Sequence, residues 1–382
     1  MQENSKKKGL KDFPDASSRR QFLEKQLKIS FNNIGNFIFT EDQVTGRNIE
    51  NLIGATQIPL GVAGPLKLQG NKLQYYIPLA TTEGALVASI SRGCKAIMEN
   101  NGVLSFVEDV GQTRGPVFKV QNLSQAIQTK SWIEENFKLL SSITQKTSSH
   151  LKLLKATVAL VGKNLFVRFQ YSTDDAMGMN MVTFATHEAV KLIEQKTKAQ
   201  CISLAGNFDI DKKPAWLNFI EGRGKKVWAE VILDKNTVKK ILKTTPEKLA
   251  EVVYRKNHLG SAMSGSLGFN AHYANILASI FIATGQDPAH VVEGSMGITT
   301  AEVLENGDLY FSIYLPSLVV GIVGGGTNLP TQKEALDIMQ SSGVLEYCQI
   351  VGAAVLAGEL SLLASLSEGT LAKAHKKLGR KS

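Results

Sequence analysis

A hairpin signal in the middle of the chain constrains the fold more than any other local feature. Two apolar runs, 157–161 and 165–169, flank the turn sequence Gly162-Lys163-Asn164, and this arrangement predicts an antiparallel hairpin. Helical patterns lie on either side of it, at 122–140 and 181–196. A helix, two strands and a second helix make a small α+β unit. Residues 116–203 are therefore expected to fold as a distinct block.

The rest of the chain mixes predicted strands with apolar helices. Strands are predicted within 58–66, 226–233 and 309–315, and helices at 18–27, from Thr82 onward, at 270–284 and at 350–366. The last helix is rich in Ala, Gly and Leu, a composition suited to close packing. With 382 residues, the chain is long enough for two or three domains.

Net charge narrows the classes of partner. The formal net charge is +9, which suits polyanions such as nucleic acid, an acidic membrane surface or a phosphorylated cofactor. No basic stripe carries interleaved aromatic residues, so a phosphorylated small molecule is favoured over nucleic acid. Part of the charge lies in the basic runs near both termini, which are also explained as solvated ends.

Membrane and secretory signals are weak in this sequence. We take 276–283 as the most apolar run; it contains a serine and is far shorter than the roughly 18 residues that span a bilayer. The N-terminus is basic but has no apolar core, so no secretory signal is expected. Cys94, Cys201 and Cys348 are widely separated, which disfavours a disulfide framework. We expect a cytoplasmic protein without a membrane partner.

Two polar islands in otherwise apolar sequence are candidates for ligand binding, and the consecutive glycines of the second suit a phosphate group. Residues 174–181 (Asp-Asp-Ala-Met-Gly-Met-Asn-Met) lie between a predicted strand and a predicted helix, and residues 321–330 contain three consecutive glycines before Thr327. Glycines let backbone N–H groups approach a ligand closely. The second island matches neither GxGxxG nor a P-loop, so a tight turn explains it equally well.

Isolated charged residues are the candidates for catalysis. Lys212 lies beside carboxylates in Asp209-Ile-Asp-Lys-Lys-Pro214, and Asp287 follows the apolar helix 270–284. A lysine near an acid can stabilise a developing oxyanion. Glu83 stands at a helix start, and His375 lies in the basic C-terminal tail, where its ordinary pKa suits a general acid. Each also has a plain alternative, namely an exposed turn, a helix cap or a solvated tail. The histidines show no zinc-ligand spacing, so no metal is expected.

Taken together, these islands resemble the 3-hydroxy-3-methylglutaryl-coenzyme A reductase family, in its eukaryotic-type (class I) form. The resemblance extends from about Glu50 to His375. It rests on long motifs that occur in consistent order: ENLIG with PLGVAGP, PLATTEGALVAS, TRGPV, DAMGMNM, DKKPAWLNFIEGRGK, GSAMSGS, FNAHYANI, GQDPAH, VGGGTNLP and LAGELSLLA.

The resemblance implies an activity and four catalytic residues. The expected reaction is a four-electron, NAD(P)H-dependent reduction of hydroxymethylglutaryl-CoA to mevalonate and CoA. In it, Lys212 stabilises the oxyanion, Glu83 supplies a proton to the aldehyde, and Asp287 tunes protonation. His375 protonates the departing CoA thiolate.

The resemblance also implies three sets of binding residues. The hydroxymethylglutaryl part would meet Arg114, Asp211, Lys213, Lys256 and Asn275. Coenzyme A would meet Ser89, Arg92 and Lys243. The nicotinamide dinucleotide would meet Asp175, Met177, Gly178, Met179, Asn180, Gly324 and Thr327.

The fold that the family implies is α+β. It comprises an N-terminal helical segment (1–41), a large substrate and CoA domain around a long central helix (42–115 and 204–360), an inserted ferredoxin-like NAD(P)-binding domain (116–203) and a C-terminal flap with His375 (361–382). The family site lies between subunits of a dimer, often paired into a tetramer, so self-association is expected.

Three departures from the family pattern affect these expectations. Ala205 replaces a substrate-binding serine, and the stretch 266–269 has one glycine fewer than animal-type sequences. Ser148-Ser149 stands where animal enzymes have a serine and an arginine for the cofactor 2′-phosphate. We expect NADPH to be preferred by a reduced margin, with Lys152 or Lys155 replacing the arginine, because no carboxylate occurs from 145 to 155. NADH remains possible.

Two other functions stay open at this point. The enzyme could work in reverse, oxidising mevalonate with NAD⁺. A catalytically silent paralogue that binds acyl-CoA is the alternative outside enzymes, and the presence of all four catalytic residues disfavours it.

Overall fold

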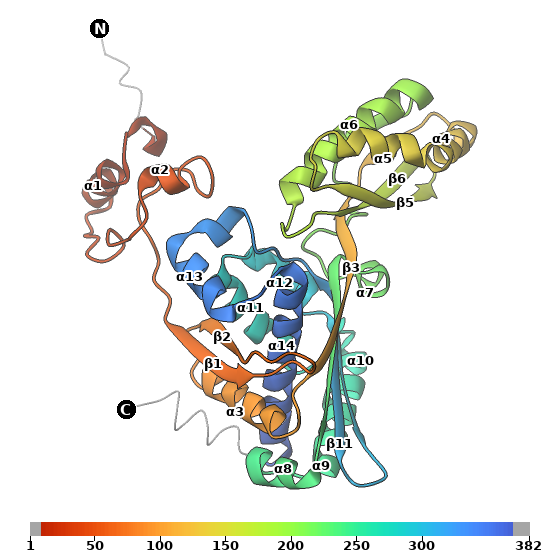
Figure 1. Ribbon diagram of the computed structural model, residues 1–382. Coiled ribbons are helices and arrows are strands. Elements are labelled where there is room, and N and C mark those ends of the chain that lie inside the picture. Colours follow the sequence, from red (N-terminus) through yellow and green to blue (C-terminus); the bar gives the residue numbers. More distant parts are fainter. Residues whose placement is uncertain (1–8, 370–382) are drawn as a thin grey trace.

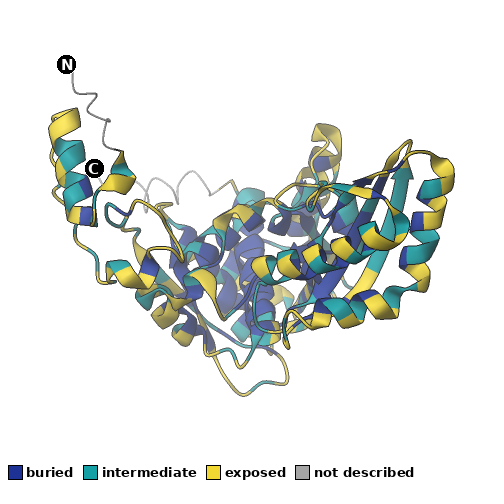
Figure 2. Cartoon of the chain, turned by 90° about the horizontal axis from the view of Figure 1, so that it is seen from above, coloured by how far each residue is buried: buried dark blue, intermediate teal, exposed yellow. Residues whose placement is uncertain are grey.

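The computed structural model describes residues 9–369, which form three parts (Figure 1). A small N-terminal part stands to one side, a large domain surrounds one long helix, and a smaller domain extends from the far edge of the large one. The long strand β3 (Leu104–Arg114) runs from the large domain into the small one. Seen from above, buried residues concentrate in the large domain and along the sheet of the small domain (Figure 2).

Helix α14 (Val344–Ser367) is the centre of the large domain. Small residues let it pack closely: a Cβ on Gly358 would lie 2.4 Å from Ile276 Cδ1, and one on Gly93 would lie 1.9 Å from the Ala357 carbonyl oxygen. By length and composition α14 could cross a membrane, so our choice of 276–283 as the most apolar stretch was wrong. Most of α14 is buried inside the protein, as a core helix would be.

Within residues 9–369, one nine-stranded sheet links the two domains. Its order is β7-β4-β6-β3-β8-β11-β10-β9, with β5 paired to β6. The strands of the large domain are β8 (Gly224–Leu233), β9 (Gly268–Phe269), β10 (Gly297–Val303) and β11 (Leu309–Leu318), and β1 (Leu60–Leu66) pairs with β2 (Tyr75–Ala80) in a separate sheet. The predicted strands in these regions are confirmed.

The small domain confirms the expected ferredoxin-like arrangement. Its strands are β4 (Val117–Lys119), β5 (Lys152–Val161), β6 (Asn164–Ser172) and β7 (Gln200–Ser203). Helices α4 (Leu123–Glu135) and α5 (Phe137–Gln145) connect β4 to β5, and α6 (Met179–Thr197) connects β6 to β7. Neighbouring strands are antiparallel, in the order β7-β4-β6-β5. Val161 pairs with Asn164 across a two-residue turn, as the hairpin signal predicted. The single helix predicted at 122–140 is broken at Asn136.

The remaining helices of the large domain surround α14 or cover the sheet edges. They are α3 (Leu86–Met98), α7 (Trp216–Glu221), α8 (Lys235–Thr237), α9 (Pro246–Val252), α10 (Ser261–Ser264), α11 (Tyr273–Thr284), α12 (Val291–Gly294) and α13 (Pro330–Met339), with the π-helical turns η2 (Val238–Leu242) and η3 (Val253–Gly260) and the 3₁₀ turns η4 (Pro288–His290) and η5 (Gly325–Asn328). We expected α3 to start at Thr82; it starts four residues later because Ala85 has a left-handed φ of 75°.

The boundaries of the outer parts differ from the expected ones. Helices α1 (Ala16–Leu27) and α2 (Glu41–Val44) follow the short turn η1 (Leu10–Asp12). Arg19 and Arg20 donate hydrogen bonds to the carbonyls of Leu52 and Ile53, so the N-terminal part continues past the expected boundary at 41. At the other end, α14 runs unbroken through 361, where we expected the C-terminal flap to begin.

Candidate active site

Lys212 and Asp287 form an ion pair where the two domains meet. Lys212 lies in the loop between β7 and α7, and Asp287 follows the last turn of α11. Lys212 Nζ lies 2.7 Å from Asp287 Oδ2, and both side chains are partly exposed. Burial raises the pKa of the Asp287 carboxyl, but hydrogen bonds from Lys212 and the Ala289 amide, together with the charge of His290, lower the pKa overall. Asp287 is thus an anion that holds the ammonium group in place.

The loop that carries Lys212 has an unusual backbone. Ile210 and Lys212 both have left-handed φ angles, 52° and 57°, which cost energy for residues other than glycine. The Lys212 amide donates a hydrogen bond to Glu293 Oε1 at 3.2 Å. The loop conformation is therefore held from below by a side chain 81 residues further along the chain.

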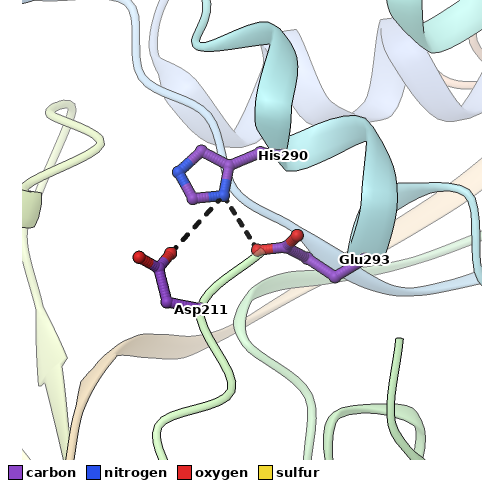
Figure 3. A group of neighbouring side chains, drawn as sticks. All are labelled: Asp211, His290 and Glu293. Carbon is purple, nitrogen blue, oxygen red and sulfur yellow. Dashed lines mark hydrogen bonds and ion pairs between the residues drawn. The ribbon is translucent and has the colours of Figure 1, made fainter. Parts of the chain in front are cut away.

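Beneath this loop, Asp211, His290 and Glu293 converge (Figure 3). One ligand atom from each lies within 4.8 Å of the others, a grouping that could hold a metal ion. However, the buried guanidinium of Arg223 already lies 2.5 Å from Glu293 Oε1 and 2.9 Å from Asp211 Oδ1. Because this resident cation contacts both carboxylates, the cluster does not fit a metal site.

Arg114, Asp211 and Lys213, expected at the substrate, gather around the same loop. Arg114 NH1 lies 3.7 Å from the buried carboxylate of Asp209, whose pKa burial raises. Lys213 Nζ donates to the Asp211 carbonyl at 3.0 Å. These three side chains thus lie near Lys212 and give the loop a mixed but largely cationic surface.

The islands 174–181 and 321–330 line a shared pocket of about 500 Å³. The lining includes the predicted cofactor residues Met177, Gly178, Met179, Asn180, Gly324 and Thr327, and also Asp287. Gly321 packs so closely that a Cβ would lie 2.3 Å from the Met177 amide nitrogen. Gln286 holds the second island, because its amide both donates to and accepts from the Gly321 backbone. The Ile322 amide joins the two islands by donating to the Asp175 carbonyl at 2.8 Å. Backbone groups and a nearby acid–base pair fit a nicotinamide dinucleotide.

Two predicted cofactor residues have structural partners. Asp175 Oδ1 accepts a hydrogen bond from the Val344 amide at 2.8 Å, at the first residue of α14. A carboxylate there satisfies an otherwise unpaired N–H group and complements the helix dipole. The Thr327 hydroxyl donates to the Gly324 carbonyl within its own turn. Asp175 thus anchors α14, while Thr327 still lines the pocket.

The predicted CoA residues lie beside the C-terminal half of α14. The Ser89 hydroxyl donates to Ser361 Oγ, and Arg92 donates to Ser361 Oγ and Ser365 Oγ. Burial lowers the pKa of Arg92. Lys243 is exposed at the end of η2, a segment that packs against α3.

Glu83 and Asn275 lie at the other end of α11 from Asp287. Asn275 Nδ2 donates to Glu83 Oε1 at 3.4 Å. From Asn275 to its last residue, Thr284, α11 extends about 14 Å at the usual helical rise. Within one chain, Glu83 therefore does not join the Lys212–Asp287 pair. Lys256 is exposed on η3, and His375 lies outside the described residues.

The surroundings of the expected 2′-phosphate site contain carboxylates that residues 145–155 alone did not indicate. Lys155 Nζ lies 2.7 Å from Glu221 Oε2, and His150 Nδ1 lies 3.0 Å from Asp174 Oδ2. The absence of carboxylates from 145 to 155 was therefore a misleading argument, because the fold brings two of them from other segments. Lys152 remains exposed.

Comparison with known proteins decides the family. The family model described as hydroxymethylglutaryl-coenzyme A reductase matches residues 15–380. The chain belongs to the hydroxymethylglutaryl-coenzyme A reductase family. The 3-hydroxy-3-methylglutaryl-coenzyme A reductase of Methanocaldococcus jannaschii is 51% identical over 95% of this chain and 92% of its own. Reductase 3 of Oryza sativa subsp. japonica is 44% identical over 90% of this chain and 64% of its own.

Solved structures of the same family share the fold. The class II reductase of Streptococcus pneumoniae, bound to NADPH in open conformations, superposes with a TM-score of 0.69 over 92% of this chain and 97% of that one. Only 18% of its residues are identical, so this similarity establishes the fold alone. The expected class I form gains no support from these class II structures.

Sequence reasoning missed four residues of this reductase site: Arg223, Gln286, His290 and Glu293. A weak signal existed for two of them, since Asp287, His290 and Glu293 are spaced three residues apart, which places side chains on one face of a helical segment. Arg223 lies between two glycines in a motif that we quoted only for recognition. Nothing in the sequence indicated that its guanidinium is buried.

Proposed function

We propose that this protein reduces 3-hydroxy-3-methylglutaryl-CoA to mevalonate and CoA with a reduced nicotinamide dinucleotide. The observation that carries the proposal is the 2.7 Å Lys212–Asp287 pair, with Asp287 in the glycine-lined pocket. An ammonium group at the edge of such a pocket can stabilise an oxyanion as it forms. Membership of the reductase family supports the same reaction.

The proposed chemistry assigns one role to each catalytic side chain. Two reduced nicotinamide dinucleotides, bound one after the other, would each supply one hydride. Lys212 stabilises the oxyanion formed from the thioester carbonyl, the hemithioacetal expels CoA thiolate, and His375 gives the thiolate a proton. At the aldehyde, Lys212 again stabilises the oxyanion and Glu83 supplies the proton that completes the alcohol. Asp287 keeps the Lys212 ammonium group in position throughout.

Binding is assigned to the three sets predicted from the sequence. Arg114, Asp211, Lys213, Lys256 and Asn275 hold the hydroxymethylglutaryl part, for which the cations around the Lys212 loop supply attraction to its free carboxylate. Ser89, Arg92 and Lys243 face CoA beside α14. Met177 to Asn180, Gly324 and Thr327 hold the dinucleotide; Asp175 acts indirectly, by anchoring α14.

The complete site is proposed to form between two copies of the chain. Glu83 and Asn275 lie about one helix length from Lys212 and Asp287 within a chain. A second copy that presents its Glu83 to the first copy's Lys212 would complete the set. An exposed apolar surface on the large sheet, including Leu104, Phe106 and Ile232, offers area for such an interface.

NADPH is proposed as the preferred cofactor by a small margin. Lys152 is exposed just beyond Ser148 and Ser149, where it can meet a 2′-phosphate. Lys155 contributes less than we expected, since Glu221 already pairs with it, and Asp174 adds negative charge beside His150. The margin therefore depends mainly on Lys152.

Class and location are further proposals. The chain is 44–51% identical to archaeal and plant reductases but 17–18% identical to class II structures, which favours assignment to class I. A cytoplasmic location fits Cys94, Cys201 and Cys348, all of which are free thiols.

The test is a spectrophotometric assay with purified protein. Reduced cofactor should be consumed when hydroxymethylglutaryl-CoA or mevaldehyde is added, with mevalonate as product. Binding of the CoA ester without cofactor oxidation would support the silent paralogue instead. Rapid oxidation of mevalonate with NAD⁺ and a clear NADH preference would support the reverse, catabolic direction.

A further inference from the structure

A chain of buried charged groups lies directly behind the Lys212–Asp287 pair. Arg223, His290 and Glu293 are fully buried, although charged side chains are almost never buried without a partner. His290 lies in the turn η4 and Glu293 in the short helix α12, and Arg223 immediately precedes β8. None of the three is assigned a part in the proposed reaction.

Glu293 holds the main chain of the catalytic lysine. Its Oε1 atom accepts from Arg223 NH1 at 2.5 Å, from His290 Nδ1 at 2.8 Å and from the Lys212 amide at 3.2 Å. Since Lys212 is held at a left-handed φ of 57°, the contact from Glu293 fixes a backbone conformation that the residue would otherwise leave.

His290 connects Glu293 to Asp287. Because a carboxylate only accepts, the Nδ1 atom that lies 2.8 Å from Glu293 carries the hydrogen. The opposite ring nitrogen, Nε2, lies 3.7 Å from Asp287 Oδ2, the oxygen that also contacts Lys212 Nζ. Among residues 9–369, this buried Nε2 atom has no hydrogen-bond partner. The imidazole thus contacts Asp287 from behind while Lys212 contacts it from the pocket side.

We propose that Glu293 and His290, neutralised by Arg223, are positioning residues that aim the Lys212 ammonium group at the carbonyl being reduced. Glu293 sets the backbone of Lys212, and His290 sets the place of Asp287, which in turn sets the Lys212 side chain. The inference rests on the proposed function and assigns positioning roles to residues behind the Lys212–Asp287 pair. The charged and titratable groups around His290 are Asp211, Arg223, Asp287, Glu293 and, through Asp287, Lys212.

The decisive comparison is between His290→Gln and His290→Leu in the full chain. Glutamine keeps an N–H donor for Glu293 but cannot carry charge; leucine removes both properties. His290→Leu should lower kcat for both hydroxymethylglutaryl-CoA and mevaldehyde by about 10- to 100-fold while the KM values change little, because misplacement of a catalytic group affects turnover. His290→Gln should recover part of kcat.

Both variants should also move the acidic limb of the pH–kcat profile to higher pH. The charge of His290 lowers the pKa of Asp287, so its loss should raise that pKa and neutralise the carboxylate earlier as the pH falls. His187→Gln, at an exposed histidine of α6, is the matched control and should behave as the wild type. If leucine prevents folding, the glutamine variant alone still reports kcat and the pH profile.

Two results would overturn the inference. Unchanged kcat and pH profile in His290→Gln and His290→Leu would show that the network has no part in positioning. If kcat and thermal stability fall and KM rises together, while the acidic limb stays where it is in the wild type, His290 is merely structural. Failure of the proposed function is a separate result, because then the wild-type protein itself would reduce neither substrate.

Discussion

Two regions of this molecule pair a cation with a carboxylate at similar distances but in different surroundings. Under the catalytic loop, Arg223 lies 2.5 Å from Glu293 and both side chains are buried. Between the two domains, Lys155 of β5 lies 2.7 Å from Glu221 of α7 and both side chains are substantially exposed. Water and salt screen the exposed pair, whereas removal of one partner from the buried pair leaves an unpaired charge. Burial, more than distance, decides how strongly each pair constrains the protein.

The largest expected effect belongs to Lys212, which the buried network holds. Lys212→Ala should lower turnover about a thousand-fold with CoA-ester affinity mostly intact, because the oxyanion forms only after substrate binds. Steady-state kinetics with both substrates measure this. Undiminished reduction of hydroxymethylglutaryl-CoA and mevaldehyde would refute the role of Lys212.

The same variant should change the titration of Asp287. Lys212 lowers the pKa of this carboxyl, so Lys212→Ala should raise it, which carbon-13 NMR of labelled Asp287 can detect. A carboxyl whose pKa is lowered by folding stabilises the folded state at every pH above its ordinary pKa. That stabilisation is lost as the pH falls through the lowered pKa. The variant should therefore lose that contribution at neutral pH.

The next effect tests the comparison of the two ion pairs directly. Arg223→Met should destabilise the protein by about 3–5 kcal/mol, because it leaves Glu293 buried without its cation. Lys155→Met should cost at most about 1 kcal/mol, as is typical of an exposed pair. Urea denaturation of both variants gives the two numbers. Equal losses would break the comparison.

A smaller effect is expected from the tail histidine, His375. His375→Gln should slow hydroxymethylglutaryl-CoA reduction about 100-fold, because thiolate departure loses its general acid. Reduction of added mevaldehyde should stay near the wild-type rate, since that step releases no thiolate. If both substrates are slowed alike, His375 acts structurally.

The smallest effect concerns the exposed surface of the small domain. Asp174→Asn should raise the ratio of kcat/KM for NADPH over NADH by about two- to fivefold, because removal of a screened negative charge beside His150 weakens repulsion of a 2′-phosphate. Glu188→Gln removes an exposed carboxylate of α6 that pairs with Lys191 and serves as the control. A ratio that stays constant in Asp174→Asn would place the cofactor phosphate elsewhere.

The sequence alone was sufficient for features set by neighbouring residues. The Gly162-Lys163-Asn164 turn predicted the β5–β6 hairpin, because turn chemistry and the flanking apolar runs act within a few residues. The islands at 174–181 and 321–330 were taken as candidate binding elements; the structure brings them to one pocket, and their binding role stays a prediction. The start of α3 was missed by four residues, because the left-handed backbone of Ala85 has no signature in its side chain.

Only the tertiary structure could decide which distant groups meet. Asp175 was expected at the cofactor, yet it caps α14, 169 residues further along the chain. The basic, carboxylate-free surroundings expected for Lys155 acquired Glu221 from another element. The buried trio of Arg223, His290 and Glu293 had no sequence signal strong enough to predict it. Local patterns depend on chain neighbours, which the sequence contains directly; the contacts that position Lys212 and Asp287 depend on how whole helices and strands pack, which brings residues together regardless of their separation.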